Sequence, residues 1–232
     1  MDFSSWEPQY LQILDDFKFP READERSAKY LSELLEKHTK DLELIDPEYL
    51  EKLLKDQPVF IFGEGLTLND DLEAFDEEGT LITADGATSA ALKHNIVPDI
   101  IVTDLDGRIE DQIEAVKKGA VILIHAHGDN QKQLERWVPK FAGKVMGTTQ
   151  AEPFSNIQNF GGFTDGDRAV FLADHFKAKS INLIAFDFLE VGDHSEDSAV
   201  KLKMRKLTWA NLLIAILDNP NIQFIPSNSR SQ

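Results

Sequence analysis

The sequence predicts an α/β protein in which a mostly parallel sheet is covered by helices on both faces. From about residue 58 onward, short apolar runs alternate with amphipathic segments of helix length. The runs are apolar almost throughout, which is typical of parallel strands because both faces of such strands are buried. No internal repeat or low-complexity linker interrupts the alternation. Together these features predict a Rossmann-like fold.

The candidate strands are the apolar runs, namely PVFIF (58–62), TLITA (80–84), DIIVT (99–103), AVILIH (120–125), KVMGTT (144–149) and INLIAF (181–186). The candidate helices lie between most of these runs, namely LNDDLEAF, ATSAALKHN, IEDQIEAVKKG and QKQLERWVPKF. A long helix, SAVKLKMRKLTWANLLIAILD, is expected after the last strand.

A helical segment, residues 1–56, is predicted to precede the Rossmann-like domain, residues 57–232. Apolar residues recur at three- and four-residue spacing in ADERSAKYLSELLEKHTK and in DPEYLEKLLKD. The Asp-Pro pair that opens the second stretch is a favourable helix start. This spacing therefore predicts helices and no strands in the segment.

The composition of the 232 residues is that of an ordinary globular protein, with 42% apolar and 28% charged residues. The formal net charge of −17 argues against binding to nucleic acid or to an anionic membrane, because both need a basic face. The negative net charge is compatible with phosphorylated substrates, since bound metal ions can offset the charge of acidic residues in a site. No apolar run approaches the roughly 18 residues of a membrane span, and the N-terminus lacks signal-peptide features, so a cytoplasmic location is expected. The chain has no cysteine, which excludes disulfides and thiolate chemistry.

Polar residues follow the predicted strands at the point where each strand ends. GEG follows the first strand, DG the second, DLDG the third and HAHGDN the fourth, while Asp187 follows INLIAF. In open α/β sheets, ligands bind outside the carboxyl ends of the strands. We therefore expect these segments to form one functional edge.

Three carboxylates of this edge, Asp85, Asp104 and Asp106, repel one another unless something positive lies among them. With no cysteine and few histidines nearby, an oxygen-only set suits Mg²⁺ or Mn²⁺. Such a metal shares its remaining positions with water and substrate phosphates. The three residues thus predict a metal–nucleotide site.

The glycine-containing turn after the first strand, Gly63, Glu64 and Gly65, is a candidate phosphate contact, and Gly86 is grouped with it. Glycines there let backbone N–H groups approach a phosphate, and the N-terminus of the following helix favours an anion. The turn is neither a Walker loop nor a GxGxxG fingerprint. A plain tight turn explains it equally well.

Two segments of this edge also resemble signatures of other enzyme classes. DLDG resembles the start of the haloacid dehalogenase signature, which usually lies on the first strand and continues into Thr or Val, whereas here it lies on the third and continues into Arg108. HAHGDN resembles the HxHxDH signature of metallo-β-lactamase-type hydrolases, with an Asn in place of the final His. The preferred interpretation is that this segment lines a ligand pocket through His125, His127, Asp129 and Asn130.

The segment GGFTDGDRA is predicted to enter a helix capped by Thr164 or Asp165, with acidic residues at the positive end of the helix. Thr164 and Asp165 are also candidate substrate contacts. Arg168 in the first turn opposes the helix dipole, so an anionic partner such as a phosphate would explain it. The basic cluster KLKMRKL (201–207) is either a solvated helix face or a set of cations over phosphates, including Lys201 and Lys206.

As a set, the motifs GEGLTL, ADGAT, VPDIIVTDLDG, HAHGDN and GGFTDGDRA resemble the archaeal 6-hydroxymethyl-7,8-dihydropterin pyrophosphokinases. That family is itself similar to the catalytic domain of thiamine pyrophosphokinase, whose pattern is ADG…PD…GDxDS. The resemblance covers roughly residues 58 to 217. Gly107, where the thiamine enzymes typically have Ser, and the HAHGDN segment favour the pterin branch.

The resemblance implies transfer of a diphosphate from ATP to the primary hydroxyl of a hydroxymethylpterin, with release of AMP, in tetrahydromethanopterin or folate-type cofactor synthesis. It implies Mg²⁺ on the three aspartates and phosphate contacts from the GEG turn, Arg168 and the basic cluster. Asp106, ahead of His127, is expected to accept the hydroxyl proton. Asp129 or Asp165 would read the guanidine-like edge of the pterin. A homodimer is expected only by analogy.

Three alternatives stay open at the level of the sequence. One is a thiamine pyrophosphokinase-like diphosphotransferase on the same scaffold. Another is a non-catalytic nucleotide-binding module, with the N-terminal helices as its partner surface. The third is a metal-dependent phosphohydrolase, which needs no acceptor.

Overall fold

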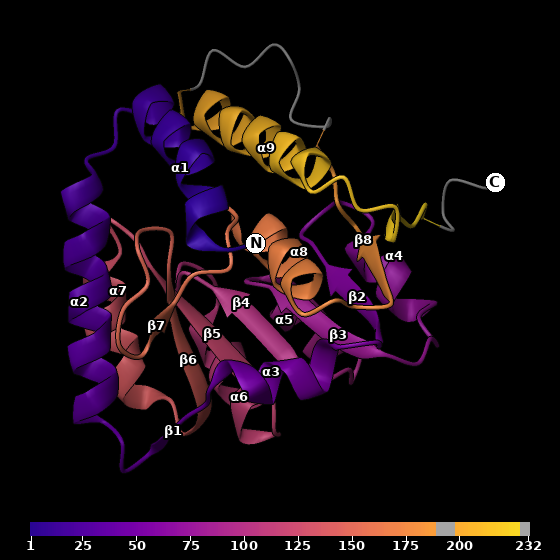
Figure 1. The fold of residues 1–232 in the computed structure, drawn as a ribbon. Coiled ribbons are helices and arrows are strands. Elements are labelled where there is room, and N and C mark those ends of the chain that lie inside the picture. Colours follow the sequence, from indigo (N-terminus) through magenta and orange to yellow (C-terminus); the bar gives the residue numbers. More distant parts are fainter. Residues whose placement is uncertain (189–197, 228–232) are drawn as a thin grey trace.

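The computed structural model describes residues 1–188 and 198–227, and in them a parallel sheet lies between two layers of helices (Figure 1). The strands follow the order β1-β6-β5-β4-β3-β2-β8-β9, β7 also pairs with β6, and every strand pair is parallel. The strand bounds are β1 Leu42–Leu44, β2 Pro58–Phe62, β3 Thr80–Ala84, β4 Ile100–Thr103, β5 Val121–Ala126, β6 Gly143–Thr149, β7 Ile157–Gln158, β8 Ser180–Ile184 and β9 Ile222–Phe224. The predicted fold class is confirmed.

Helices cover both faces of the sheet, as the uniformly apolar strands require. The helix bounds are α1 Phe3–Phe17, α2 Arg21–Lys37, α3 Pro47–Leu54, α4 Leu68–Glu73, α5 Ala87–Lys93, α6 Ile109–Lys117, α7 Gln131–Trp137, α8 Asp165–His175 and α9 Ser198–Ile216. Strand β4 contacts both layers: Ile100 and Val102 pack with α3 and α8, whereas Ile101 packs with α2, α6 and α7. Helices α4 and α5 cover β2 and β8 within a further apolar cluster.

The N-terminal helices pack into the same body as the rest of the chain. Figure 1 shows α1 (indigo) and α9 (yellow) side by side on the outer side of α8. Trp6 and Tyr10 of α1 are buried with Phe171 of α8 and Leu213 of α9. Helix α2 contributes a stripe of buried residues to the core of one face, and α3 contributes to the core of the other.

Three short strands were not predicted from the sequence. Strand β1 lies within the segment expected to be purely helical and pairs with β6, while β7 pairs with β6 and β9 pairs with β8. Each has only two or three residues. A segment of that length shows no periodicity of its own, because its pairing is decided by the neighbouring strand.

The predicted helix start at Asp46 is confirmed, because its side chain accepts a hydrogen bond from the Tyr49 N–H at 2.9 Å. Pro47 occupies the first helical position, where a missing N–H costs nothing. Within the part of the chain that the structure describes, no helix combines the length and the apolar character that crossing a bilayer requires.

If α2 is part of the central core, Leu35→Ala should lower the free energy of unfolding of the whole protein by about 2–5 kcal/mol. Leu35 is fully buried between α2 and the sheet. Urea unfolding followed by circular dichroism and by tryptophan fluorescence would measure this. Leu11→Ala is the control, since Leu11 is 47% exposed and its loss should cost less than about 0.5 kcal/mol. Separate transitions for the two probes would instead indicate that the N-terminal helices unfold independently.

Candidate functional site

The parallel pairing places the predicted polar segments along one edge of the sheet. β8, β2, β3, β4 and β5 are successive neighbours and run in the same direction. The segments that follow them therefore leave the sheet at the same side. This confirms the expectation that the GEG, DG, DLDG and HAHGDN segments and Asp187 share an edge.

The three predicted metal-ligand aspartates converge at this edge. One oxygen from each of Asp85, Asp104 and Asp106 lies within 4.8 Å of the others. Asp85 is buried and its Oδ1 accepts hydrogen bonds from the Thr103 hydroxyl at 2.6 Å and from the Gln112 side-chain amide at 2.8 Å. Asp106 lies at the surface, so the cluster opens to solvent on one side. An oxygen-only set at this spacing is suited to a hard divalent cation.

The three aspartates of the cluster have different pKa values, because they differ in burial and in the charges around them. Burial, together with the neighbouring aspartates, raises the pKa of Asp85 to about 7. Burial would also raise the pKa of Asp104, but the hydrogen bond and charge of His127 and the charge of Arg168 outweigh it, and the pKa is lowered to about 2. The pKa of Asp106 is raised by loss of solvent and by the charge of Asp104. The cluster therefore gains by taking up either protons or a cation.

The backbone around the aspartates adopts conformations that L-residues rarely occupy. Asp85 has φ 37° and Leu105 has φ 68°, both in the left-handed region. The Leu105 N–H donates to the Thr103 hydroxyl at 2.9 Å, which helps to hold the turn. A Cβ at Gly107 would collide with Asp85 Oδ2. The glycine at this position is therefore needed to bring the backbone against the carboxylate.

The glycine turn after β2 packs against the end of β8. The N–H groups of Gly63 and Gly65 donate to Ile184 and Ala185 carbonyls at 2.9 and 2.8 Å. A Cβ at either glycine would approach the Ala185 carbonyl oxygen to 2.8 Å or less, so close packing explains both glycines. Glu64 reaches across and accepts a hydrogen bond from the Gly86 backbone. A phosphate contact of this turn stays a prediction.

The HAHGDN loop after β5 is built around Asn130. Its side-chain amide donates to the carbonyls of Asp104 at 2.9 Å and His125 at 2.7 Å, and its oxygen accepts from the His127 N–H at 3.0 Å. Asn130 is 3% exposed and is engaged by the backbone on every side. Asn130 therefore shapes the loop, and a contact between Asn130 and substrate stays a prediction.

The two histidines of this loop have opposite electrostatic environments. His127 Nε2 lies 3.1 Å from Asp104 Oδ2, and its Nδ1 lies 2.7 Å from Asp129 Oδ1. Burial alone would lower the pKa of His127, but these two carboxylates raise it overall. Burial and the charge of Arg168 lower the pKa of His125 well below the ordinary value, and its Nε2 has no hydrogen-bond partner among the described residues. His127 therefore favours the cation and His125 the neutral ring.

The start of α8 brings a buried cation to the same edge. Thr164 is the N-cap, and its N–H donates to Asp167 Oδ1 at 2.8 Å. Arg168 is 8% exposed and forms an ion pair with Asp165 at 2.8 Å. Asp165 thus supplies a hydrogen-bond acceptor for Arg168, while burial and the charge of Asp104 raise the pKa of the Asp165 carboxyl well above its ordinary value. The Arg168 Nε still has no partner among the described residues, so a further anion could be bound there.

Helix α9 contributes only part of its basic cluster to the site. The charge of Lys206 acts on Asp106 and Asp129, and that of Lys203 acts on Glu64. Arg205 instead pairs with Asp16 of α1 at 2.9 Å. Lys201 is exposed on the first turn of α9, and its phosphate contact stays a prediction.

The sequence reasoning missed several side chains that hold the site. Thr103 and Gln112 fix Asp85, and Asp24 of α2 accepts a hydrogen bond from the Gly128 N–H at 2.7 Å. A signal for two of them was present. Gln112 interrupts the apolar face of its helix, and Asp24 lies on the buried stripe of α2 that continues through Ala28. A polar residue at such a position needs a buried partner.

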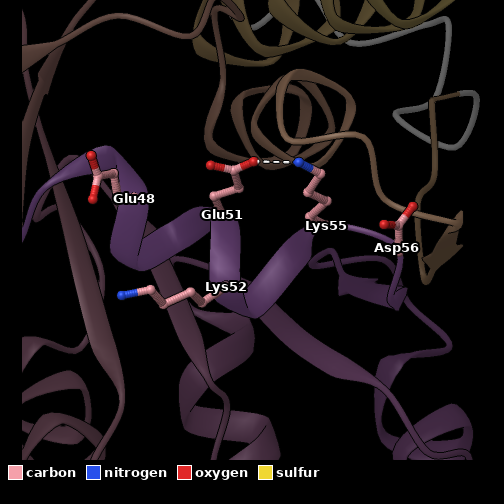
Figure 2. A pocket seen from close by; sticks show the side chains of 5 residues that line it. All are labelled: Glu48, Glu51, Lys52, Lys55 and Asp56. Atoms are coloured by element: carbon pink, nitrogen blue, oxygen red, sulfur yellow. Dashed lines mark hydrogen bonds and ion pairs between the residues drawn. The ribbon is translucent and has the colours of Figure 1, made fainter.

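A shallow pocket lies on α3 (Figure 2). Its lining residues are Glu48, Glu51, Lys52, Lys55 and Asp56. Glu51 and Lys55 form an exposed ion pair at 2.7 Å, and Figure 2 shows Lys52 pointing away from them. The pocket shares no residue with the predicted site, and its charged lining is that of a solvated helix face.

Fold and site together define an α/β protein with a parallel sheet and a carboxylate-rich site at the carboxyl ends of its strands. Residues 32–192 match the family model described as 6-hydroxymethylpterin diphosphokinase MptE-like. The chain belongs to this family, which confirms the resemblance seen in its motifs.

Three archaeal relatives, each named 6-hydroxymethyl-7,8-dihydropterin pyrophosphokinase, resemble the chain over nearly its whole length. The protein of Methanothermobacter thermautotrophicus is 42% identical over 94% of this chain and 96% of its own. That of Methanocaldococcus jannaschii is 39% identical over 97% and 100%. That of Pyrococcus furiosus is 42% identical over 94% and 95%. The similarity therefore includes the N-terminal helices.

The raised pKa of Asp85 has a consequence for stability in the absence of metal. Between its ordinary pKa of 3.8 and its folded value of about 7, the folded protein holds a proton that the unfolded chain has lost. The free energy of unfolding should therefore fall as the pH rises through this window, by roughly 2–4 kcal/mol. In Asp85→Asn this decrease should be smaller. Urea unfolding in a chelator at several pH values would measure both.

Asp70→Asn is the control for this experiment, because Asp70 is an exposed carboxylate on α4. It should keep the pH dependence of the wild-type protein. An equal pH dependence in Asp85→Asn and in the wild type would contradict the assignment of the titrating group.

Proposed function

We propose that the protein transfers a diphosphate from ATP to the hydroxymethyl group of 6-hydroxymethyl-7,8-dihydropterin and releases AMP. The observation that carries the proposal is the set of converging carboxylates Asp85, Asp104 and Asp106 in a chain that belongs to the diphosphokinase family. Three relatives named 6-hydroxymethyl-7,8-dihydropterin pyrophosphokinase match 94–97% of the chain. The product would enter the synthesis of a tetrahydromethanopterin- or folate-type cofactor.

We propose Mg²⁺, with Mn²⁺ as a substitute, as the metal held by the three aspartates. The fit rests on their oxygen-only donor set and on Asp104 Oδ1, which is buried without a hydrogen-bond partner among the described residues. When bound, the metal would neutralise charge on the phosphates of ATP and help to orient them.

The remaining residues have proposed roles in binding charge and moving a proton. Arg168, whose buried Nε has no partner in the described part of the chain, and Lys206 would bind phosphate oxygens. In the reaction the pterin hydroxyl oxygen attacks the β-phosphorus of ATP. The bond between the β-phosphorus and the oxygen that bridges it to the α-phosphorus breaks, and AMP leaves with that oxygen. We propose Asp106 as the proton acceptor, because it is the exposed member of the cluster and a substrate hydroxyl can reach it from solvent. His127, held as a cation by two carboxylates, is suited to stabilise negative charge instead.

The geometry favours Asp165 over Asp129 for reading the guanidine-like edge of the pterin. The Asp129 side chain is 90% exposed and already contacts His127. Asp165 is 14% exposed, lies near the aspartate cluster and is oriented by Arg168. A buried carboxyl group gives stronger and more selective hydrogen bonds than an exposed one.

An assay of AMP release from ATP and Mg²⁺, with 6-hydroxymethyl-7,8-dihydropterin and thiamine as parallel acceptors, tests the proposal. AMP should form with the pterin alone, and mass spectrometry should show the diphosphate ester. AMP with thiamine alone would keep the reaction type and refute the acceptor. Phosphate release without any acceptor would indicate a hydrolase, and nucleotide binding without turnover would indicate a binding module.

Asp106→Asn should lower kcat by about 100-fold or more while the protein stays folded. Loss of a metal-binding carboxylate should cost more than loss of a residue that only orients a metal ligand. Asp111→Asn is the matched control, since Asp111 lies on the neighbouring helix and pairs with Arg108 at 3.4 Å. Steady-state kinetics with Mg²⁺ titration and circular dichroism would measure turnover and folding. Wild-type turnover in Asp106→Asn would remove this residue from the site.

A further inference from the structure

We propose that Asp24 of α2 is a positioning residue that fixes the loop His127–Asn130 from the N-terminal helices. The inference rests on the proposed function in one respect: its kinetic consequence is measured in that reaction. Its structural basis is independent, because the contacts of Asp24 involve none of the three aspartates of the cluster.

The Asp24 carboxylate joins three parts of the chain that are far apart in sequence. Its Oδ1 accepts from the Gly128 N–H at 2.7 Å, and its Oδ2 accepts from the Tyr10 hydroxyl and the Gln150 amide, each at 2.8 Å. Asp24 is 2% exposed, and no Lys or Arg pairs with it among the described residues. A carboxylate buried without a cation is costly unless several donors surround it. These donors are therefore needed for the charge to be tolerated.

The loop backbone lies directly against the first turns of α2. A Cβ at Gly128 would approach the Cβ of Ala23 to 3.1 Å and Asp24 Oδ1 to 3.4 Å. These distances leave little room for a side chain at this point. The glycine thus permits the close approach that the hydrogen bond requires.

The two peptide units that flank the His127 Cα are both anchored. The His127 N–H donates to Asn130 Oδ1 at 3.0 Å, and the Gly128 N–H donates to Asp24. The orientation of these two peptide units sets the direction of the His127 side chain, whose Nε2 reaches Asp104 Oδ2 at 3.1 Å. Asp24 therefore acts on the site through the loop, and the N-terminal helices acquire a role in catalysis.

Substitutions at Asp24 and at Tyr10, which donates to it, distinguish a positioning role of Asp24 from a role in packing alone. In Asp24→Ala the Gly128 N–H loses its acceptor, and kcat should fall about 10-fold, with little change in KM for ATP. Asp24→Asn should retain most of the wild-type kcat, because its oxygen can accept from Gly128. A flip of the Gln150 side-chain amide, whose Nε2 now donates to Asp24, would turn Oε1 toward the new amide as an acceptor. Tyr10→Phe is the matched control: it removes a donor to the same carboxylate but leaves the Gly128 bond, so kcat should stay near the wild-type value.

The amide resonance of Gly128 in ¹H–¹⁵N spectra gives a readout that does not depend on activity. It should move upfield and exchange faster with solvent in Asp24→Ala, and stay close to its wild-type position in Tyr10→Phe. Wild-type kcat in Asp24→Ala, an equal loss of kcat in Tyr10→Phe, or an unchanged Gly128 resonance in Asp24→Ala would each overturn the inference.

Gly128→Ala decides the question if Asp24→Ala does not fold. The added methyl group presses on Ala23 and shifts the loop while Asp24 stays intact. A folded variant with reduced kcat supports the inference, and wild-type kcat overturns it. If the wild-type protein transfers no diphosphate to the pterin, the proposed function fails. The Gly128 resonance still tests the hydrogen bond between Asp24 and the loop.

Discussion

Parallel alignment of neighbouring strands is the constraint on which the site depends. β3, β4 and β5 pair in register, and the Asp85 N–H donates to the Val102 carbonyl beyond the last ladder residues of β3. Residues separated by about twenty positions in the chain thus leave the sheet beside one another. The converging carboxylates, the histidine loop and the start of α8 have no common local motif. They meet because the sheet brings their strand and helix ends to one edge.

The charges at this edge are arranged so that the fold tolerates them without any ligand. Asp85 is buried and takes up a proton readily, whereas Asp104 is kept ionised beside His127 and Arg168. Neighbouring carboxylates thus differ in charge, which reduces their repulsion. Within residues 1–188 and 198–227, buried polar atoms of Asp104, His125 and Arg168 have no hydrogen-bond partner. Internal packing does not satisfy these groups, so a ligand that supplies both donors and acceptors would be bound strongly.

The sequence was sufficient for the six longer strands of the sheet and for the polar residues that follow them, because strand runs and the polar residues at their ends are local patterns. The convergence of Asp85, Asp104 and Asp106 followed from that pattern. Contacts between distant segments were beyond it. The Tyr10 and Gln150 side chains both reach Asp24, and Arg205 turns to Asp16 of α1. Such pairings depend on how α1, α2 and α9 pack on the sheet, which no local spacing encodes. The short strands β1, β7 and β9 were missed for the same reason.

The left-handed backbone at Asp85 and Leu105 bears on how the protein tolerates change over evolution. Each such residue costs on the order of 1 kcal/mol, and the rest of the fold must supply the stability that holds it. Substitutions that relax this turn should accumulate easily under selection for thermal stability alone. They would also move the carboxylates apart, so gains in stability at this turn should come with losses in function. Thermostable variants of this protein should therefore carry their stabilising changes in the helical layers and leave the DLDG turn untouched.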